Sequence, residues 1–119
     1  MDKMIFLVDD TDSILTLAAA ALDNDFRVLT MSSAQKMFKL LEKKKPDLIL
    51  MDIEMPEMNG FDAIAKLRET PERSDIPVLF LTGYIDDTVT ARSAELGALG
   101  VLDKTEISST LLTRVKEII

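Results

Sequence analysis

The chain has 119 residues, which is enough for one domain with a buried core and too few for two. Its 14 basic and 21 acidic residues give a net charge of −7, which argues against binding to nucleic acid or to an anionic membrane surface. The sequence contains no cysteine and no histidine, so disulfides, thiol chemistry and the common zinc and histidine-base sites are excluded.

The predicted elements alternate between short apolar runs and segments whose apolar residues recur at helical spacing. The runs are nearly continuous, which is typical of strands that are buried on both faces of a parallel sheet. In chain order the predicted strands are 4–8, 26–29, 48–51, 78–81 and 99–102, and the predicted helices between and after them have their apolar faces within 14–22, 37–41, 61–65, 88–96 and 107–118.

Residues at the element boundaries support this division. Gly97 suits a helix C-terminus, and the lysines at 43–45 are interpreted as the basic last turn of a helix. The candidates for capping helix N-termini are Thr11 or Asp12, Ser32 or Ser33, and Ser108. Five strand–helix units in one chain predict an α/β domain over residues 1–119, with a parallel sheet covered on both faces. The pattern leaves two doubly wound strand orders open, and both place ligands at the carboxyl ends of the strands.

The carboxyl ends of the predicted strands carry the candidate functional residues. Asp9 and Asp10 follow the first strand, Asp52 the third, Thr82 the fourth and Lys104 the fifth. Carboxylates at one edge repel each other, and a divalent cation with oxygen ligands relieves this, which favours Mg²⁺ with Mn²⁺ as a substitute. Asp52 would then be placed to attack phosphorus and to hold an acyl phosphate, assisted by the other two polar groups.

Taken singly, each of these residues has an ordinary structural explanation. Asp9 and Asp10 suit the N-terminus of a helix, Asp52 a turn, Thr82 a strand end and Lys104 a solvated surface. Their joint placement on strand ends favours a common site.

Four motifs extend this interpretation: VDD at 8–10, LMDIEMPEMNG at 50–60, FLTG at 80–83 and GALGVLDK at 97–104. Together they resemble the receiver domain of two-component response regulators, and the likeness covers essentially the whole chain. The resemblance implies a flavodoxin-like (βα)5 fold with strand order 2-1-3-4-5. It implies that Asp52 accepts a phosphoryl group from a histidine kinase or a histidine phosphotransfer protein, assisted by Thr82 and Lys104.

The resemblance also implies a Mg²⁺ site formed by Asp10, Asp52 and the backbone carbonyl of Glu54, with Asp9 holding a metal-bound water. Met55-Pro56 and Gly60 would shape the loop beside the acceptor. We therefore expect a phosphoacceptor regulatory domain rather than an enzyme, with only weak self-phosphorylation and self-dephosphorylation. Its output would be a change in partner or output-domain binding, with a homodimer or partner surface on the 88–119 face. The lack of a transmembrane-length run or a signal-peptide core makes a cytoplasmic location the expectation, without direct nucleic-acid or membrane binding.

The sequence departs from the family pattern at two positions. Val101 stands where the family usually has tyrosine or phenylalanine, and Tyr84 is a candidate substitute aromatic. Lys104 is followed by Thr105 instead of proline, so either Lys104 reaches the site by a different backbone path or the bond to Thr105 is cis and strained. Glu54 and Tyr84 occupy positions that tune acyl-phosphate lifetime in the family, and they predict slow self-dephosphorylation.

Two other functions remain open on these residues. One is a pseudo-receiver, a binding module without phosphorylation switching, which Val101 and Thr105 favour. The other is a Mg²⁺-dependent phosphohydrolase of the haloacid-dehalogenase type, because DIE at 52–54 loosely resembles its Asp-x-Asp motif. That nucleophile normally follows the first strand of its fold, and this chain is short and has no cap insertion.

Overall fold

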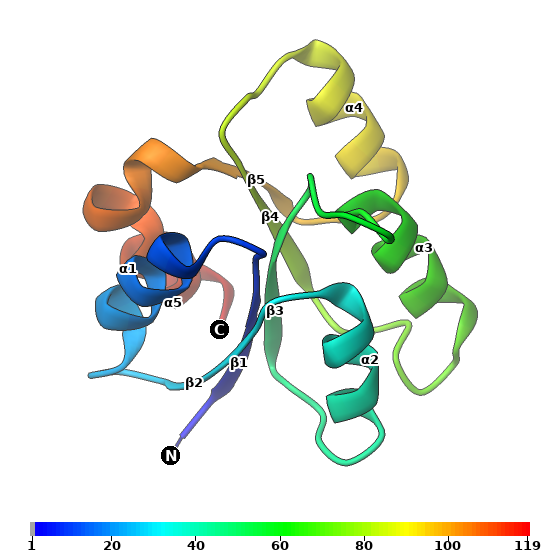
Figure 1. Ribbon diagram of the computed structural model, residues 1–119, viewed down its shortest axis with the longest axis horizontal. Coiled ribbons are helices and arrows are strands. Elements are labelled where there is room, and N and C mark those ends of the chain that lie inside the picture. The colour runs from blue at the N-terminus through cyan, green and yellow to red at the C-terminus, as the bar shows by residue number, and fades with distance from the viewer. Residues whose placement is uncertain (1) are drawn as a thin grey trace.

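Five parallel strands form the centre of the computed structural model, which describes residues 2–119 (Figure 1). They are β1 (Met4–Val8), β2 (Arg27–Met31), β3 (Leu48–Asp52), β4 (Val78–Thr82) and β5 (Gly100–Asp103). The spatial order is β2-β1-β3-β4-β5, which confirms the order implied by the resemblance. β2 begins later than predicted because the N–H of Phe26 still donates to the Leu22 carbonyl, within the turn that closes the preceding helix.

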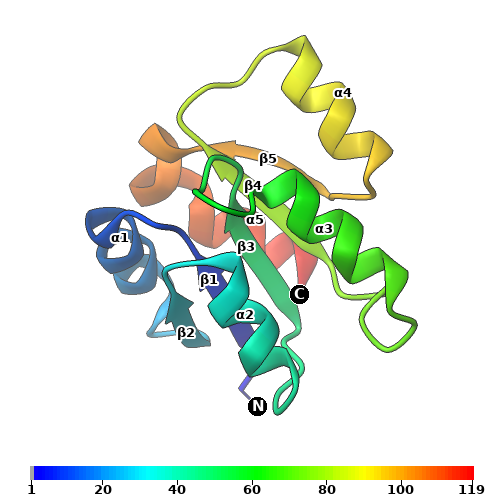
Figure 2. The ribbon, with the colours of Figure 1, turned by 45° about the vertical axis from the view of Figure 1, so that its right-hand side comes forward.

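Helices cover both faces of the sheet, as the alternating pattern predicts. They are α1 (Asp12–Leu22), α2 (Ala34–Leu41), α3 (Gly60–Glu69), α4 (Asp87–Glu95) and α5 (Leu112–Ile118). Figures 1 and 2 show α1 and α5 together on one side of the sheet, and α2, α3 and α4 on the other. Among residues 2–119, no helix combines the length and apolar character needed to cross a bilayer.

The core consists of two apolar clusters, one on each face of the sheet, because successive strand residues point to opposite sides. The side that faces α2 and α3 contains Phe6, Val8, Ile49, Met51, Val78 and Phe80. The side that faces α1 and α5 contains Ile5, Leu7, Leu48, Leu50, Leu79 and Leu81. All twelve side chains are fully buried, and burial of each contributes about 1.5–3 kcal/mol. This rigid sheet fixes the positions of the residues that follow its strands.

The helix ends confirm some of the predicted caps and contradict others. Ser33 caps α2 by accepting from the N–H of Lys36, and Gly97 has a left-handed φ of 81° just after α4. Thr11 occupies the N-cap position of α1, but its side chain makes no capping hydrogen bond there. The prediction for the lysines at 43–45 is wrong, because α2 ends at Leu41 and these residues follow it.

The segment after β5 is irregular, and the prediction of one continuous helix over 107–118 is wrong in its first part. A 3₁₀ turn η1 (Lys104–Glu106) and a π-helical turn η2 (Ile107–Leu111) precede α5. Ser108 lies inside η2 and is not a cap. The hydroxyls of Ser109 and Thr110 instead donate to the Glu106 carbonyl. The bond between Lys104 and Thr105 is trans, like the other peptide bonds of residues 2–119, so the lysine arrives without a cis peptide.

Candidate functional site

The register of the central strands brings the predicted acidic residues together. β1 pairs with β3 so that Val8 lies opposite Met51, which sets Asp9 beside Asp52 at the carboxyl edge. Asp9, Asp10 and Asp52 each place one carboxylate oxygen within 4.8 Å of the other two. Asp9 is completely buried, Asp52 is 3% exposed, and Asp10 is exposed. These three residues, the carboxylate cluster, form a site that is open to solvent on the Asp10 side.

Lys104 reaches this cluster from the end of β5 and contacts two of its carboxylates. Its Nζ lies 2.9 Å from Asp9 Oδ2 and 3.1 Å from Asp52 Oδ1, with only 18% of the lysine side chain exposed. The geometry at Asp9 Oδ2 does not satisfy a hydrogen bond, and within the described residues this buried oxygen has no other partner. We therefore interpret the contact with Asp9 as an attraction between charges that leaves lone pairs of Oδ2 unused.

Backbone N–H groups also hold these two carboxylates, at the second oxygen of Asp9 and at the same oxygen of Asp52 that Lys104 contacts. Asp9 Oδ1 accepts from the Thr11 N–H at 2.9 Å, and Asp52 Oδ1 accepts from the Glu54 N–H at 3.2 Å. Each contact spans two residues, so each aspartate stabilises the turn that follows its own strand. These turns fix the orientation of both carboxylates before any ligand binds.

The electrostatics of the site raise two pKa values. Burial, followed by the charge of Asp9, raises the pKa of Asp52 to about 6, although the Lys104 ammonium acts in the opposite direction. Burial alone would lower the pKa of Lys104, but its close contacts with the carboxylates of Asp9 and Asp52 outweigh it and raise that pKa. The ammonium therefore stays charged near neutral pH, while the negative charge of the cluster is only partly compensated.

The cluster fits a hard divalent cation. It provides carboxylate oxygens from three residues within 4.8 Å of one another, including the buried and incompletely satisfied Oδ2 of Asp9. Oxygen ligands of this kind suit Mg²⁺ and Mn²⁺. Glu54 has an exposed side chain that is separate from the cluster, and only its backbone lies at the site, donating to Asp52.

Thr82 lies at the end of β4 and Tyr84 follows it, and the two side chains differ in exposure. Thr82 is 2% exposed, and its hydroxyl donates to the Tyr84 carbonyl and accepts from the Tyr84 N–H, both at 3.2 Å. The hydroxyl is therefore engaged by the loop after β4, and no hydrogen bond joins it to Asp52 or Lys104 in the described chain. The Tyr84 side chain is 65% exposed.

Val101 is half-buried in β5 and borders a surface hollow beside α4. The hollow has a volume of about 270 Å³, and Ile85 and Leu99 also line it. These two residues are 41% and 53% exposed, which makes this region one of the more apolar parts of the surface. Because residue 101 is a valine, no larger side chain from this position fills the hollow.

The loop after Asp52 has one feature that the sequence predicts, at Gly60, and two that it does not, both at Glu57. Gly60 was expected to shape this loop, and a Cβ there would lie only 2.5 Å from the Asp52 backbone oxygen. Glu57 has a φ of 69°, in a region that residues other than glycine rarely adopt. Its carboxylate accepts a hydrogen bond of 3.2 Å from Gln35 of α2. Positive φ in a glutamate has no reliable sequence signal, because asparagine and aspartate are the usual non-glycine residues there.

Comparison with known families decides the class of the protein. The model of the response regulator receiver domain matches residues 5–116. The chain belongs to this family. It is 32% identical over 120 residues to the transcriptional regulatory protein PhoP of Bacillus subtilis, covering all of this chain and 49% of PhoP. It is also 32% identical over 116 residues to the protein PilH of Pseudomonas aeruginosa, covering 97% of this chain and 96% of PilH.

Solved structures place this receiver domain among close structural relatives. The chemotaxis protein CheY4 of Vibrio cholerae superposes with a TM-score of 0.93 at 26% identity, with both chains fully covered. The Mn²⁺-bound form of the response regulator Rcp1 gives a TM-score of 0.82 at 25% identity, covering 98% of this chain and 91% of Rcp1. The receiver chain spans less than half of several curated relatives, including 19% of the protein RcaC of Microchaete diplosiphon.

Family membership confirms the fold and the general function that the four motifs indicate. The chain is a receiver domain of two-component response regulators, which is a regulatory domain rather than a typical enzyme. The comparisons give no support to the phosphohydrolase or the pseudo-receiver alternative.

Proposed function

We propose that this receiver domain accepts a phosphoryl group on Asp52 from the phosphohistidine of a histidine kinase or phosphotransfer protein. The observation that carries the proposal is the position of Asp52, which adjoins two other carboxylates and lies 3.1 Å from the Lys104 ammonium. In the transfer, the P–N bond to histidine breaks and a P–O bond to an Asp52 oxygen forms. The histidine nitrogen keeps the electron pair of the broken bond and takes up a proton.

The protein's own residues support this transfer in three ways. The Asp52 carboxylate, whose pKa is about 6, is ionised at neutral pH and is more basic than an ordinary aspartate. Lys104 offsets negative charge on the carboxylate and, we infer, on the incoming group. Thr82 is the proposed donor to a phosphoryl oxygen, which requires its hydroxyl to leave the Tyr84 backbone.

Asp9, Asp10 and Asp52 are the residues that would hold Mg²⁺ or Mn²⁺, together with the Glu54 carbonyl implied by the family resemblance. When bound, the cation would neutralise charge on the phosphoryl oxygens and on the carboxylates. We expect Mg²⁺ to raise the melting temperature of the protein, because it binds the folded state. Asp10→Asn, which changes an exposed ligand, should reduce this shift, whereas Asp12→Asn on the adjacent helix should not.

The decisive experiment is incubation with acetyl phosphate and Mg²⁺, followed by intact-mass measurement. We expect one phosphoryl group per chain in the unaltered protein and none in Asp52→Asn. Asp75→Asn, which removes an exposed aspartate at the other end of the sheet, is the matched control and should be labelled normally. Labelling that persists in Asp52→Asn would exclude Asp52 as the acceptor, and continuous turnover of a phosphate ester would favour the phosphohydrolase.

The proposed output is altered binding at the 88–119 face, either to a second copy or to another protein. This face includes the 270 Å³ hollow between α4 and β5 and the exposed Leu99. Slow loss of the phosphoryl group is part of the same proposal, through the exposed side chains of Tyr84 and Glu54, which follow β4 and β3. Tyr84→Ala should accelerate phosphate loss, and an unchanged rate would show that the ring does not hinder water.

A further inference from the structure

The lysines of this acidic chain are concentrated in one short segment. Residues 36–45 contain five lysines and one glutamate, so they carry a charge of +4 within a chain of −7, and the remaining residues carry −11. Lys36 and Lys39 lie on α2, and Lys43, Lys44 and Lys45 lie just after it. All five side chains are exposed. We call this segment the lysine surface.

Most of these charges are not neutralised by the protein itself. Lys45 pairs with Asp75 at 3.0 Å, and Lys36 donates to the Ser32 hydroxyl at 2.8 Å. Within residues 2–119, no ion pair or side-chain hydrogen bond involves Lys39, Lys43 or Lys44. Lys36, Lys39 and Lys43 follow the spacing i, i+3 and i+7, which places them along one face of the helix and of the turn that follows it.

The lysine surface is also hollowed. Two adjoining depressions, each of about 470 Å³, share Lys36 and Lys39 in their walls. One continues to Met31, Leu40 and Lys43. The other continues to Pro56 and Glu57, in the loop that follows Asp52. Together they form a groove whose walls contain three lysines and two glutamates, Glu42 and Glu57, with Met31 and Leu40 at one end and Pro56 at the other.

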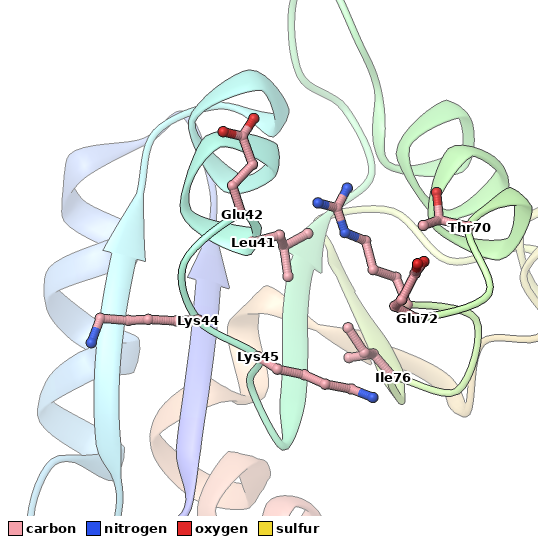
Figure 3. Close-up of a pocket in the computed structure, with 8 residues that line it drawn as sticks. Leu41, Glu42, Lys44, Lys45, Thr70, Glu72 and Ile76 are labelled. Atoms are coloured by element: carbon pink, nitrogen blue, oxygen red, sulfur yellow. The ribbon is translucent and has the colours of Figure 1, made fainter.

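A third depression, of about 410 Å³, adjoins the last two lysines. It lies between the end of α2 and the segment before β4, and its walls contain Leu41 and Ile76 together with Glu42 and Glu72 (Figure 3). Figure 3 shows the side chains of Lys44 and Lys45 extending to opposite sides of the chain, with Lys45 directed toward Ile76. Apolar groups are therefore accessible beside cations at both ends of the lysine surface.

We propose that the lysine surface binds an acidic, leucine-containing segment of a partner protein. Free lysine ammonium groups attract carboxylates, and the apolar parts of the groove accept aliphatic side chains between them. α2 has eight residues and is therefore about 12 Å long, which an extended peptide covers with about four residues. The binding surface is distinct from the carboxylate cluster and does not require phosphorylation of Asp52.

The charge distribution favours a short acidic segment over a long polyanion. A DNA duplex or an anionic membrane extends beyond the lysine surface and meets the remaining residues, whose net charge is −11. At physiological salt, charges interact over about 8 Å, so a compact segment interacts with the lysines without approaching most of that acidic surface. Lysine is also a mobile point charge that lacks the bidentate geometry of arginine, which suits weak and salt-sensitive binding.

The test uses the unphosphorylated protein and a synthetic, fluorescein-labelled peptide of about a dozen residues, mostly glutamate with a few leucines. Fluorescence anisotropy measures its affinity, and amide chemical shifts of the protein locate the contact. The triple variant Lys36→Gln, Lys39→Gln and Lys43→Gln neutralises the lysine surface. The matched control neutralises three cations elsewhere, as Lys3→Gln, Arg92→Gln and Lys116→Gln. Because all six residues are exposed, both variants should fold, which circular dichroism verifies.

We expect saturable binding that the triple variant weakens at least about tenfold and the control variant changes less than about threefold. Amide shifts should concentrate at residues 33–45 and 56–57, and a peptide with glutamine in place of glutamate should not bind. The proposal is overturned by equal binding to the triple and control variants, or by absence of binding at about 1 mM peptide. Tighter binding of a short DNA duplex or of phosphatidylserine vesicles would also overturn it, because the partner would then be another class of molecule.

Discussion

The two ends of the sheet contain the same kind of ion pair in different surroundings. At the carboxyl end, Lys104 lies 3.1 Å from Asp52, and the side chains are 18% and 4% exposed. At the amino end, Lys45 lies 3.0 Å from Asp75, and the side chains are 55% and 70% exposed. The separations are nearly equal, so the difference between these pairs lies in solvent and in neighbouring charges.

The consequences for the two aspartates are opposite. The hydrogen bond and charge of Lys45 lower the pKa of Asp75. Burial and the charge of Asp9 raise the pKa of Asp52 to about 6, even though a lysine is equally close. A nearby cation therefore does not by itself stabilise a carboxylate, because loss of water and a second negative charge can outweigh it. The amino end shows ordinary surface pairing, whereas the carboxyl end maintains a buried carboxylate with a raised pKa at a cost in stability.

The largest expected effect tests how tightly the carboxyl end is packed. In Gly60→Ala, the new Cβ would meet the Asp52 backbone oxygen at 2.5 Å, so the backbone that carries Asp52 must move. We expect a loss of about 3 kcal/mol in the free energy of unfolding, measured with urea. Gly83→Ala, at the end of the adjacent strand, meets nothing within 4 Å and should change stability by less than about 0.5 kcal/mol. Equal losses in the two variants would show that close packing is not specific to the Asp52 loop.

The next prediction compares the stability that is lost when each of the two lysines is replaced. Lys104→Met leaves Asp9 and Asp52 without their shared cation, and we expect a loss of about 2 kcal/mol at pH 8 in metal-free buffer. The contribution of the pair with Asp52 requires an ionised Asp52, so it should decrease as the pH falls through about 6. Lys45→Met removes the exposed pair and should leave stability nearly unchanged. A similar loss in both variants would remove the distinction between the two ends.

Arg68 gives a third test, because it joins segments of the amino end and, within residues 2–119, makes no ion pair. Its guanidinium donates to the carbonyls of Ser74 at 3.1 Å, Ile76 at 2.8 Å and Gly97 at 3.1 Å. Arg68→Met should cost about 1–2 kcal/mol, since water can replace the arginine at the more exposed carbonyls. The loss should be the same at pH 5 and pH 8, measured by urea unfolding. A strong pH dependence would mean that Arg68 acts through a carboxylate instead.

The smallest expected effect is a gain in the free energy of unfolding instead of a loss. The pKa of Asp52 is raised from 3.8 to about 6, so the folded state binds this proton more tightly than the unfolded chain. Stability due to Asp52 therefore falls as the pH rises from about 4 to about 6 and stays low above it. Asp52→Asn should gain about 1 kcal/mol at pH 8 in metal-free buffer, after allowance for screening by solvent, and nothing at pH 4. Asp75→Asn, whose carboxylate has a lowered pKa, should give no gain at pH 8.

The positions of the candidate functional residues follow from the sequence because parallel strands end at the same edge. Asp9, Asp52 and Lys104 each follow a continuous apolar run, and the structure brings all three into contact. The order of the strands did not follow from the runs themselves, because both doubly wound orders bury them equally well. It required the resemblance carried by the motifs, above all the stretch around Asp52.

Local details depended on competition between hydrogen bonds that a sequence pattern does not resolve. Ser108 has the right residue type for a cap, but it falls within the π-helical turn. The N–H groups of Lys43 and Lys44 both donate to the Leu40 carbonyl, which closes α2 before the lysines and leaves them on a turn. Thr82 is at its predicted strand end, but its hydroxyl is bound by the Tyr84 backbone, a contact that arises only from the course of the loop.

The π-helical turn before α5 has a geometric consequence for the end of the chain. Ile107, Leu111 and Val115 recur every four residues, and in an α-helix each such step overshoots a full rotation by about 40°. The wider turn between Ile107 and Leu111 has more residues per rotation, so it compensates for this drift, and all three side chains remain buried. After Val115 the interval shortens to three residues at Ile118, which reverses the drift without a second irregular turn. The terminal segment thus keeps its apolar residues in phase with the sheet by two different means, one in the backbone and one in the spacing of the side chains.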